Sequence, residues 1–103
     1  IGPVGEVAVR GTAAIHKGIS KVQSTRAKSV RKDEESIRSQ KEKMLLLKGK
    51  NGKSLFTEKD VDSMISALDK KASSLEKKAN SHKNFANRIL KDLEDVKIRD
   101  LKR

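Results

Sequence analysis

The C-terminal part of the chain carries a heptad pattern in which aliphatic or small residues recur in alternating steps of four and three. The pattern runs from position 61 to position 96 without a skip. Steps of this kind place side chains along one side of a helix that packs lengthwise against another helix. We call the row the C-terminal seam; it consists of Val61, Ile65, Leu68, Ala72, Leu75, Ala79, His82, Ala86, Ile89, Leu93 and Val96.

The start of this helix is marked by a capping pattern. Thr57 is a typical N-cap residue, and Asp60 stands three positions later, where an acidic side chain can bond back to the cap. Neither proline nor glycine occurs after that point. The pattern predicts a helix over residues 57–101.

A first helix is predicted over residues 13–48, although its apolar pattern is less regular. Arg26 and Asp33 interrupt the expected apolar side, and the step from Val22 to Val30 is longer than a heptad. At 100° per residue the side predicted to face the second helix holds mostly aliphatic residues. They are Ile15, Ile19, Val22, Val30, Ile37, Met44 and Leu47.

Two segments lack a helical pattern. Residues 49–56 contain Gly49 and the pair Asn51-Gly52, which favour a helix end and a turn. A connection this short returns the chain antiparallel to itself. Residues 1–12 contain Gly2, Pro3, Gly5 and Gly11, so a flexible N-terminal arm is predicted there.

The predicted fold class is therefore all-α, an antiparallel helical hairpin over residues 13–103 with a long, coiled-coil-like second helix. Hydrophobic residues make up 34% of the chain, and its aromatic residues are two phenylalanines. A chain this poor in apolar volume struggles to build a core alone. We therefore expect the hairpin to be completed by oligomerisation or by a partner chain.

No catalytic constellation, metal site or cofactor motif is found. The chain has no cysteine, and His82 has no second ligand three or four residues away. His16 is read as solvated, and His82 as a polar seam residue that fixes register. A non-enzymatic protein without a small-molecule substrate or cofactor is predicted. No apolar run is long enough for a membrane span and no signal-peptide core is present, so we expect a soluble chain; the compartment stays open.

The formal net charge of +11 favours an anionic partner. Almost no acidic residue is interleaved with the basic residues before Asp33. On a helical projection most of these basic residues lie together, on the side opposite the predicted apolar one. The candidate anion- or nucleic-acid-binding residues are Arg10, Lys17, Lys21, Lys28, Arg31 and Lys32.

Two functions follow from these patterns. The first is a structural assembly module whose helical seam packs with itself or with another helical protein, through Val61, Ile65, Leu68, Leu75, Ile89, Leu93 and Val96. The alternative is a sequence-independent nucleic-acid-binding or packaging protein whose basic helix face contacts the DNA or RNA backbone. Binding to a membrane surface ranks last, because the first helix lacks interfacial aromatic residues.

Overall fold

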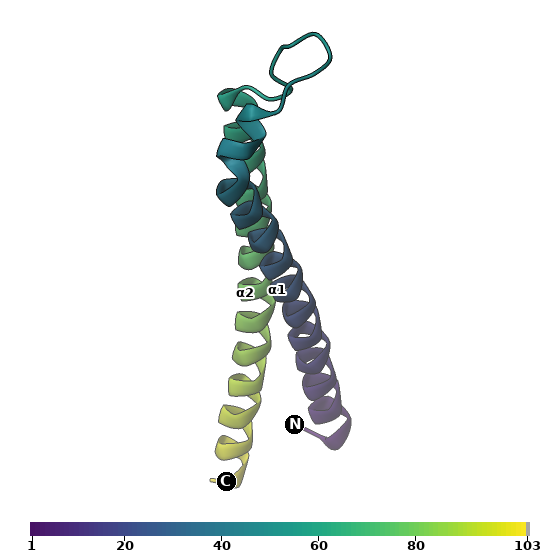
Figure 1. Ribbon diagram of the computed structural model, residues 1–103. Coiled ribbons are helices and arrows are strands. Elements are labelled where there is room, and N and C mark those ends of the chain that lie inside the picture. Colours follow the sequence, from purple (N-terminus) through teal and green to yellow (C-terminus); the bar gives the residue numbers. More distant parts are fainter. Residues whose placement is uncertain (103) are drawn as a thin grey trace. The chain divides into compact units, whose positions relative to one another are not determined.

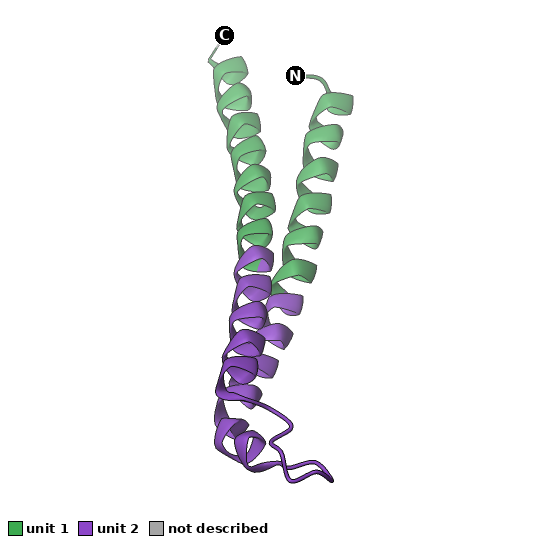
Figure 2. Cartoon of the chain, turned by 90° about the horizontal axis from the view of Figure 1, so that it is seen from above, with its two compact units in different colours: residues 1–24, 76–103 green, residues 25–75 purple. Residues whose placement is uncertain are grey.

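The computed structural model describes residues 1–102, and the regular secondary structure of these residues is helical (Figure 1). Helix α1 spans Pro3–Leu46 and helix α2 spans Glu58–Leu101, with 44 residues in each. This confirms the all-α fold class. The chain forms two compact units (Figure 2): unit 1 comprises Ile1–Ser24 and Glu76–Arg103, and unit 2 comprises Thr25–Leu75.

Unit 2 is a helical hairpin, as the sequence predicted. Its connection is closed by backbone bonds: Leu55 N donates to Leu47 O at 3.0 Å, and Gly49 N donates to Lys53 O at 2.8 Å. Gly52 has a φ of 76°, the left-handed region that glycine adopts without a steric cost. Asn51 Oδ1 accepts from Lys53 N at 3.0 Å and tightens the same turn.

The predicted capping box begins α2. Asp60 N donates to Thr57 Oγ1 at 3.1 Å, and Thr57 N donates to Asp60 Oδ2 at 2.9 Å. These two reciprocal bonds satisfy backbone donors that a helix start leaves without an intrahelical acceptor. The bond from the Thr57 backbone is the main reason why the pKa of the Asp60 carboxyl lies below its usual value.

The prediction of an irregular segment over residues 1–12 is wrong, because α1 begins at Pro3. Proline is well tolerated at the first helical position, where its missing N–H has no acceptor in any case. Glu6 lies in the first turn, where negative charge is favoured by the helix dipole. Contacts with α2 inside unit 1 add to this, including the ion pair between Glu6 and Lys97. Tertiary contacts thus outweigh the helix-breaking tendency of the glycines.

The buried side of α1 agrees with the predicted side at Val30, Ile37 and Met44, which are buried or half-buried, but it differs nearer the N-terminus. Ile15 and Val22 are 65% and 57% exposed, and Leu47 is also exposed. The buried and half-buried residues form a row in steps of three and four, which also contains small and polar residues. We call it the inner row; it consists of Glu6, Val9, Ala13, His16, Ser20, Gln23, Ala27, Val30, Glu34, Ile37, Lys41 and Met44.

Small residues explain why this row packs well in spite of its polarity. Ala72 and Ala86 of α2 are fully buried, and Ala13 and Ala27 of α1 are almost fully buried. Alanine lets two helix backbones approach closely, which maximises dispersion contacts along the seam. In unit 2 a core cluster is formed by Ala27, Val30, Ala72 and Leu75, with Leu68 packed against it.

Candidate protein-interaction face

The apolar residues that α1 does not bury form a second regular row, confined to unit 1. Val4 is 85% exposed, and Ile15 and Val22 are also more than half exposed. The row follows steps of four and three, the spacing of a helix that packs against another helix. We call it the outer row; it consists of Val4, Ala8, Gly11, Ile15, Gly18 and Val22, all of which are exposed.

The outer row lies away from α2. At 100° per residue its centre is roughly 150° from the part of the inner row at Val9, Ala13 and His16. The positions that continue the heptad after Val22 are Thr25, Ser29 and Lys32, so the apolar character ends at Val22. The outer row is therefore a bounded apolar face of about five helical turns.

Two glycines in the outer row stand where the described residues leave room for a larger side chain. A Cβ atom added at Gly11 or at Gly18 would meet no atom within 4 Å. Glycine inside a helix costs about 1 kcal/mol relative to alanine. Because no packing inside the chain requires these glycines, they fit a surface that another backbone approaches closely.

The predicted anion-binding residues divide into those with a carboxylate partner and those without. Arg10 Nε donates to Glu6 Oε1 at 3.1 Å, and Arg31 Nη1 donates to Asp69 Oδ1 at 2.6 Å. Arg31 is therefore part of the contact between α1 and α2 in unit 2, and not a free anion-binding group. Lys21 is exposed, and Lys17, Lys28 and Lys32 are exposed without a carboxylate partner among residues 1–102.

The residues predicted to form a packing seam are covered by the chain itself. Within each unit, α1 lies against this side of α2 and covers the seam wholly or in part. The buried members are Val61, Ile65, Leu75 and Leu93, and the half-buried ones are Leu68, Ile89 and Val96.

The two histidines meet inside unit 1. Nδ1 of His16 lies 2.7 Å from Nδ1 of His82, a hydrogen-bond distance. The ring of His16 also packs on Phe85, with the ring centroids 4.6 Å apart. The prediction that His16 is solvated is therefore wrong, since it is half-buried on the inner row. No group of three or more potential metal ligands occurs among the described residues.

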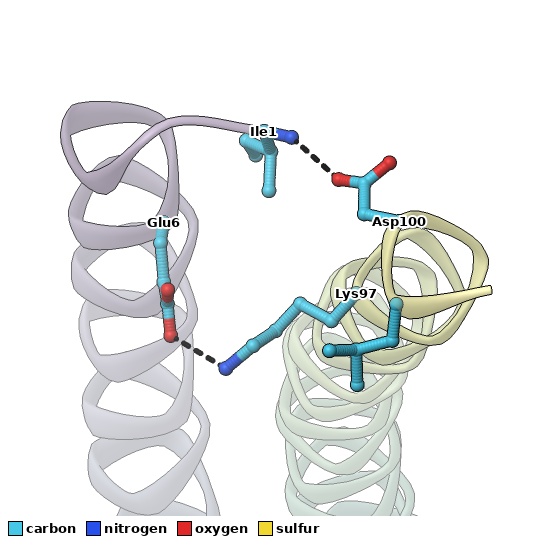
Figure 3. A pocket seen from close by; sticks show the side chains of 5 residues that line it. Ile1, Glu6, Lys97 and Asp100 are labelled. Carbon is cyan, nitrogen blue, oxygen red and sulfur yellow. Dashed lines mark hydrogen bonds and ion pairs between the residues drawn. The ribbon is translucent and has the colours of Figure 1, made fainter. Parts of the chain in front are cut away.

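Ion pairs close the end of unit 1 at which α1 begins. Figure 3 shows a small open pocket there, with Lys97 Nζ bonded to Glu6 Oε1 at 3.0 Å. The hydrogen bonds from Lys97 and then from Arg10 hold the pKa of the Glu6 carboxyl below its usual value. The pocket is also lined by Ile1, Asp100 and Leu101. The polar groups of this pocket are paired with one another, Lys97 with Glu6 and the N-terminal amine with Asp100. We therefore interpret the pocket as part of the contact between α1 and α2 and not as a ligand site.

The outer row is also visible in the sequence, as a heptad pattern separate from the inner row. The residues Ile15 and Val22 were assigned to the buried side, because apolar residues are expected to face a partner helix. Their spacing from Gly11 and Gly18, together with Val4 and Ala8, already formed a heptad of its own. Two heptad rows on one helix indicate two packing surfaces, of which the chain itself covers one.

No helix among residues 1–102 is both long and apolar enough to cross a membrane. Comparison of the chain with models of protein families, with curated proteins and with solved structures found no match to any of them.

Proposed function

We propose that this protein is a non-enzymatic assembly module that docks onto another helix through the outer row of α1. The observation that carries the proposal is the exposure of Val4, Ile15 and Val22 at heptad spacing on a helix whose inner row is already packed. Exposed apolar side chains are common singly, but a regular row on one helix face is typical of an interface.

The glycines support helical docking in particular. Gly11 and Gly18 leave room for a second backbone beside α1, and Ile15 between them offers a side chain that enters the groove of a partner helix. The partner helix would occupy the same kind of position on the outer row that α2 occupies on the inner row. The outer row, and not the C-terminal seam, is the surface through which the module would assemble.

The experiment that tests this function uses a designed helical peptide with leucine at each a and d position and glutamine at the flanking positions. Its affinity is measured by calorimetry for the wild-type chain and for the double variant I15Q/V22Q. The control variant is I98Q, which alters an exposed isoleucine of α2 in the same unit. Sedimentation velocity of the three proteins over a concentration series reports self-association.

The proposal predicts that association, with the peptide or with a second copy, is lost in I15Q/V22Q and kept in I98Q. Replacing two exposed aliphatic residues by glutamine leaves the inner row intact, so helicity and melting temperature should stay at the wild-type values. If the wild type associates by neither route, or if I15Q/V22Q associates as well as the wild type, the assembly function is wrong.

A second candidate function is sequence-independent binding of a nucleic-acid backbone. It is favoured by the net charge of +11 and by exposed lysines without a carboxylate partner, namely Lys17, Lys28 and Lys32. It leaves the outer row without a role, which is why it ranks second. A steep linear fall of log affinity for a mixed-sequence duplex with log salt, weakened in K17Q/K28Q/K32Q and unchanged in I15Q/V22Q, would favour it.

A further inference from the structure

We infer that the loop between α1 and α2 docks on an anionic phospholipid surface, with its exposed leucines in the interface and its lysines against the lipid phosphates. We call residues 47–57 the tip loop; it closes one end of unit 2 (Figure 2). The inference goes beyond the proposed assembly function, because the outer row belongs to unit 1 and shares no residue with the tip loop.

Three leucines at this end of unit 2 are exposed. Leu46 is the last residue of α1 and is 75% exposed, and Leu47 and Leu55 of the tip loop are 49% and 58% exposed. None of them belongs to the core cluster of unit 2. A single exposed leucine needs no explanation, but apolar side chains that stand together indicate an interaction surface.

The backbone of the tip loop brings two of these leucines together. Leu55 N donates to Leu47 O at 3.0 Å, next to the antiparallel bridge between Lys48 and Ser54. Residues that lie opposite each other in such a pairing project to the same face. Gly49 leaves room on this face, since a Cβ atom added to it would lie 3.5 Å from Leu55 Cδ2. Leu47 and Leu55 therefore form one apolar face of the tip loop.

The tip loop and the last turn of α1 are positively charged. All the lysines between Glu42 and Glu58 are exposed, no acidic residue stands among them, and none has a carboxylate partner among residues 1–102. Glu58, which follows the loop, is already paired with Lys41 at 3.3 Å. On an anionic lipid surface, burial of apolar side chains and attraction of lysines to phosphates add to each other. The lysines are Lys43, Lys48, Lys50 and Lys53.

The backbone groups of the tip loop bond one another. Gly49 N donates to Lys53 O at 2.8 Å, and Gly52 N donates to Gly49 O at 3.0 Å. Asn51 Oδ1 accepts from Lys53 N at 3.0 Å. Polar backbone groups without a partner are costly to remove from water. Because these groups are paired, the tip loop can enter a headgroup layer in the conformation that it has in the structure.

Other occupants fit the tip loop less well. A nucleic-acid backbone would contact the lysines and leave Leu47 and Leu55 in water. A partner helix needs a row of apolar residues at heptad spacing, and the tip loop has no helical face that offers one. Lys48 precedes the turn and Lys53 follows it, so an extended anionic surface meets the charge on both sides of the turn.

The experiment measures co-sedimentation with vesicles of phosphatidylcholine and with vesicles of equal parts phosphatidylcholine and phosphatidylserine, over a salt series. We expect the wild type to bind the anionic vesicles about ten-fold more tightly at low salt, and the preference to shrink as salt rises. K48Q/K50Q/K53Q should weaken this binding about ten-fold or more. The matched control removes the same charge from exposed lysines of α2 and should change binding by less than about three-fold. It is K70Q/K77Q/K91Q.

A second set of variants tests the leucines. L47Q/L55Q should weaken binding to the anionic vesicles about ten-fold although every lysine is kept, because apolar burial contributes separately. I15Q/V22Q changes two exposed aliphatic residues outside the tip loop and should bind the vesicles as the wild type does.

A fluorescent probe shows whether the tip loop enters the interface. The chain has no tryptophan, so a single introduced tryptophan reports its own surroundings. The emission of L55W should shift to the blue with anionic vesicles. The emission of the control I98W, at an exposed position of α2 in unit 1, should not shift.

An equal loss of binding in K48Q/K50Q/K53Q and in its matched control would overturn the inference, since net charge alone would then explain the binding. Unchanged binding of L47Q/L55Q, or an L55W emission that does not shift, would also overturn it. A wild type that binds no anionic vesicles, with or without binding of a duplex DNA, would do the same. These outcomes leave the assembly function standing, because L47Q/L55Q keeps the outer row and should bind the designed helical peptide as the wild type does.

Discussion

Nδ1 of His16 and Nδ1 of His82 face each other at 2.7 Å across the helix pair of unit 1, so the N–H of one ring donates a hydrogen bond to the lone pair of the other. Both rings are half-buried, and their planes are tilted by 30°. Ser20 Oγ donates to Ala79 O at 2.7 Å one turn away. In this part of unit 1, hydrogen bonds between polar side chains therefore hold α1 against α2 at positions where most helix pairs have aliphatic side chains.

Replacing one histidine of the pair should weaken the packing of unit 1. In H16L, Nδ1 of His82 loses its partner while the ring stays half-buried, and a half-buried polar group without a hydrogen bond costs free energy. We expect the free energy of unfolding to drop by about 1 kcal/mol.

The measurement is urea unfolding of the wild type, of H16L, of H82L and of H16L/H82L. The double variant replaces both partners and leaves no polar ring alone, so it should lose less stability than the two single variants added together. Single variants as stable as the wild type would show that the histidine bond does not hold the unit.

Replacing Glu34 by leucine should stabilise unit 2. Glu34 is buried on the inner row, and its Oε2 lacks a hydrogen-bond partner, with Arg38 Nη2 at 3.5 Å. Removing a buried charge from an apolar seam is often neutral or stabilising, and Arg31 retains Asp69 and Ser73. We expect E34L to gain roughly 1 kcal/mol in urea unfolding. The control E35L, at an exposed position, should stay within about 0.5 kcal/mol of the wild type.

A loss of stability in E34L would contradict this prediction. It would mean that the ion pairs of Glu34 with Arg31 and Arg38 add more to the free energy of unfolding than a buried leucine side chain does. The double variant E34L/R31Q would then separate the two contributions, because Arg31 also bonds Asp69.

Two valines of α1 test which side of the helix is packed. Val30 is 8% exposed in the core cluster of unit 2, whereas Val22 belongs to the exposed outer row. V30A should cost roughly 2 kcal/mol, since a buried valine loses its transfer free energy and leaves a cavity. V22A should change stability by less than about 0.5 kcal/mol. Equal losses would mean that α1 packs as the sequence alone predicted.

The capping box gives a prediction for the start of α2. T57A should cost about 1 kcal/mol of stability, because it removes the acceptor for the N–H of Asp60. The pKa of Asp60 is lowered, so its contribution is present at neutral pH and is lost as the pH falls below its usual value of 3.8. Circular dichroism against temperature, at neutral pH and in acid, measures both effects. A T57A protein with unchanged stability would contradict the cap.

Much of the fold could be predicted from the sequence, because the residues of α2 favour a helix with clear local signals. Thr57 and Asp60 mark its start, and the C-terminal seam has aliphatic residues at nearly every heptad position. Gly49, Asn51 and Gly52 likewise mark the turn. In each case local propensity and the final structure agree.

The packing of α1 could be predicted only in part. Val30 and Ile37 were assigned to the buried side correctly, but the inner row also contains polar residues such as His16, Gln23 and Glu34. Hydrophobicity alone favoured Ile15 and Val22 for the buried side. The structure buries the side that carries Ala13 and Ala27, which lets α1 approach the alanines of α2, and it satisfies several polar groups across the interface. A sequence pattern does not contain these cross-helix bonds, so the structure was needed to show which of the two heptad rows of α1 is exposed.

The central claim is that the outer row of α1 is the docking surface, and chemical-shift mapping tests it most directly. The wild-type chain, labelled with nitrogen-15, is titrated with the designed peptide that has leucine at a and d positions and glutamine at the flanks. The account predicts that the largest amide shifts recur every three or four residues between Val4 and Val22, with small shifts along α2 in unit 2. Shifts that follow the lysines of both helices without this period, or no shifts at saturating peptide, would contradict it.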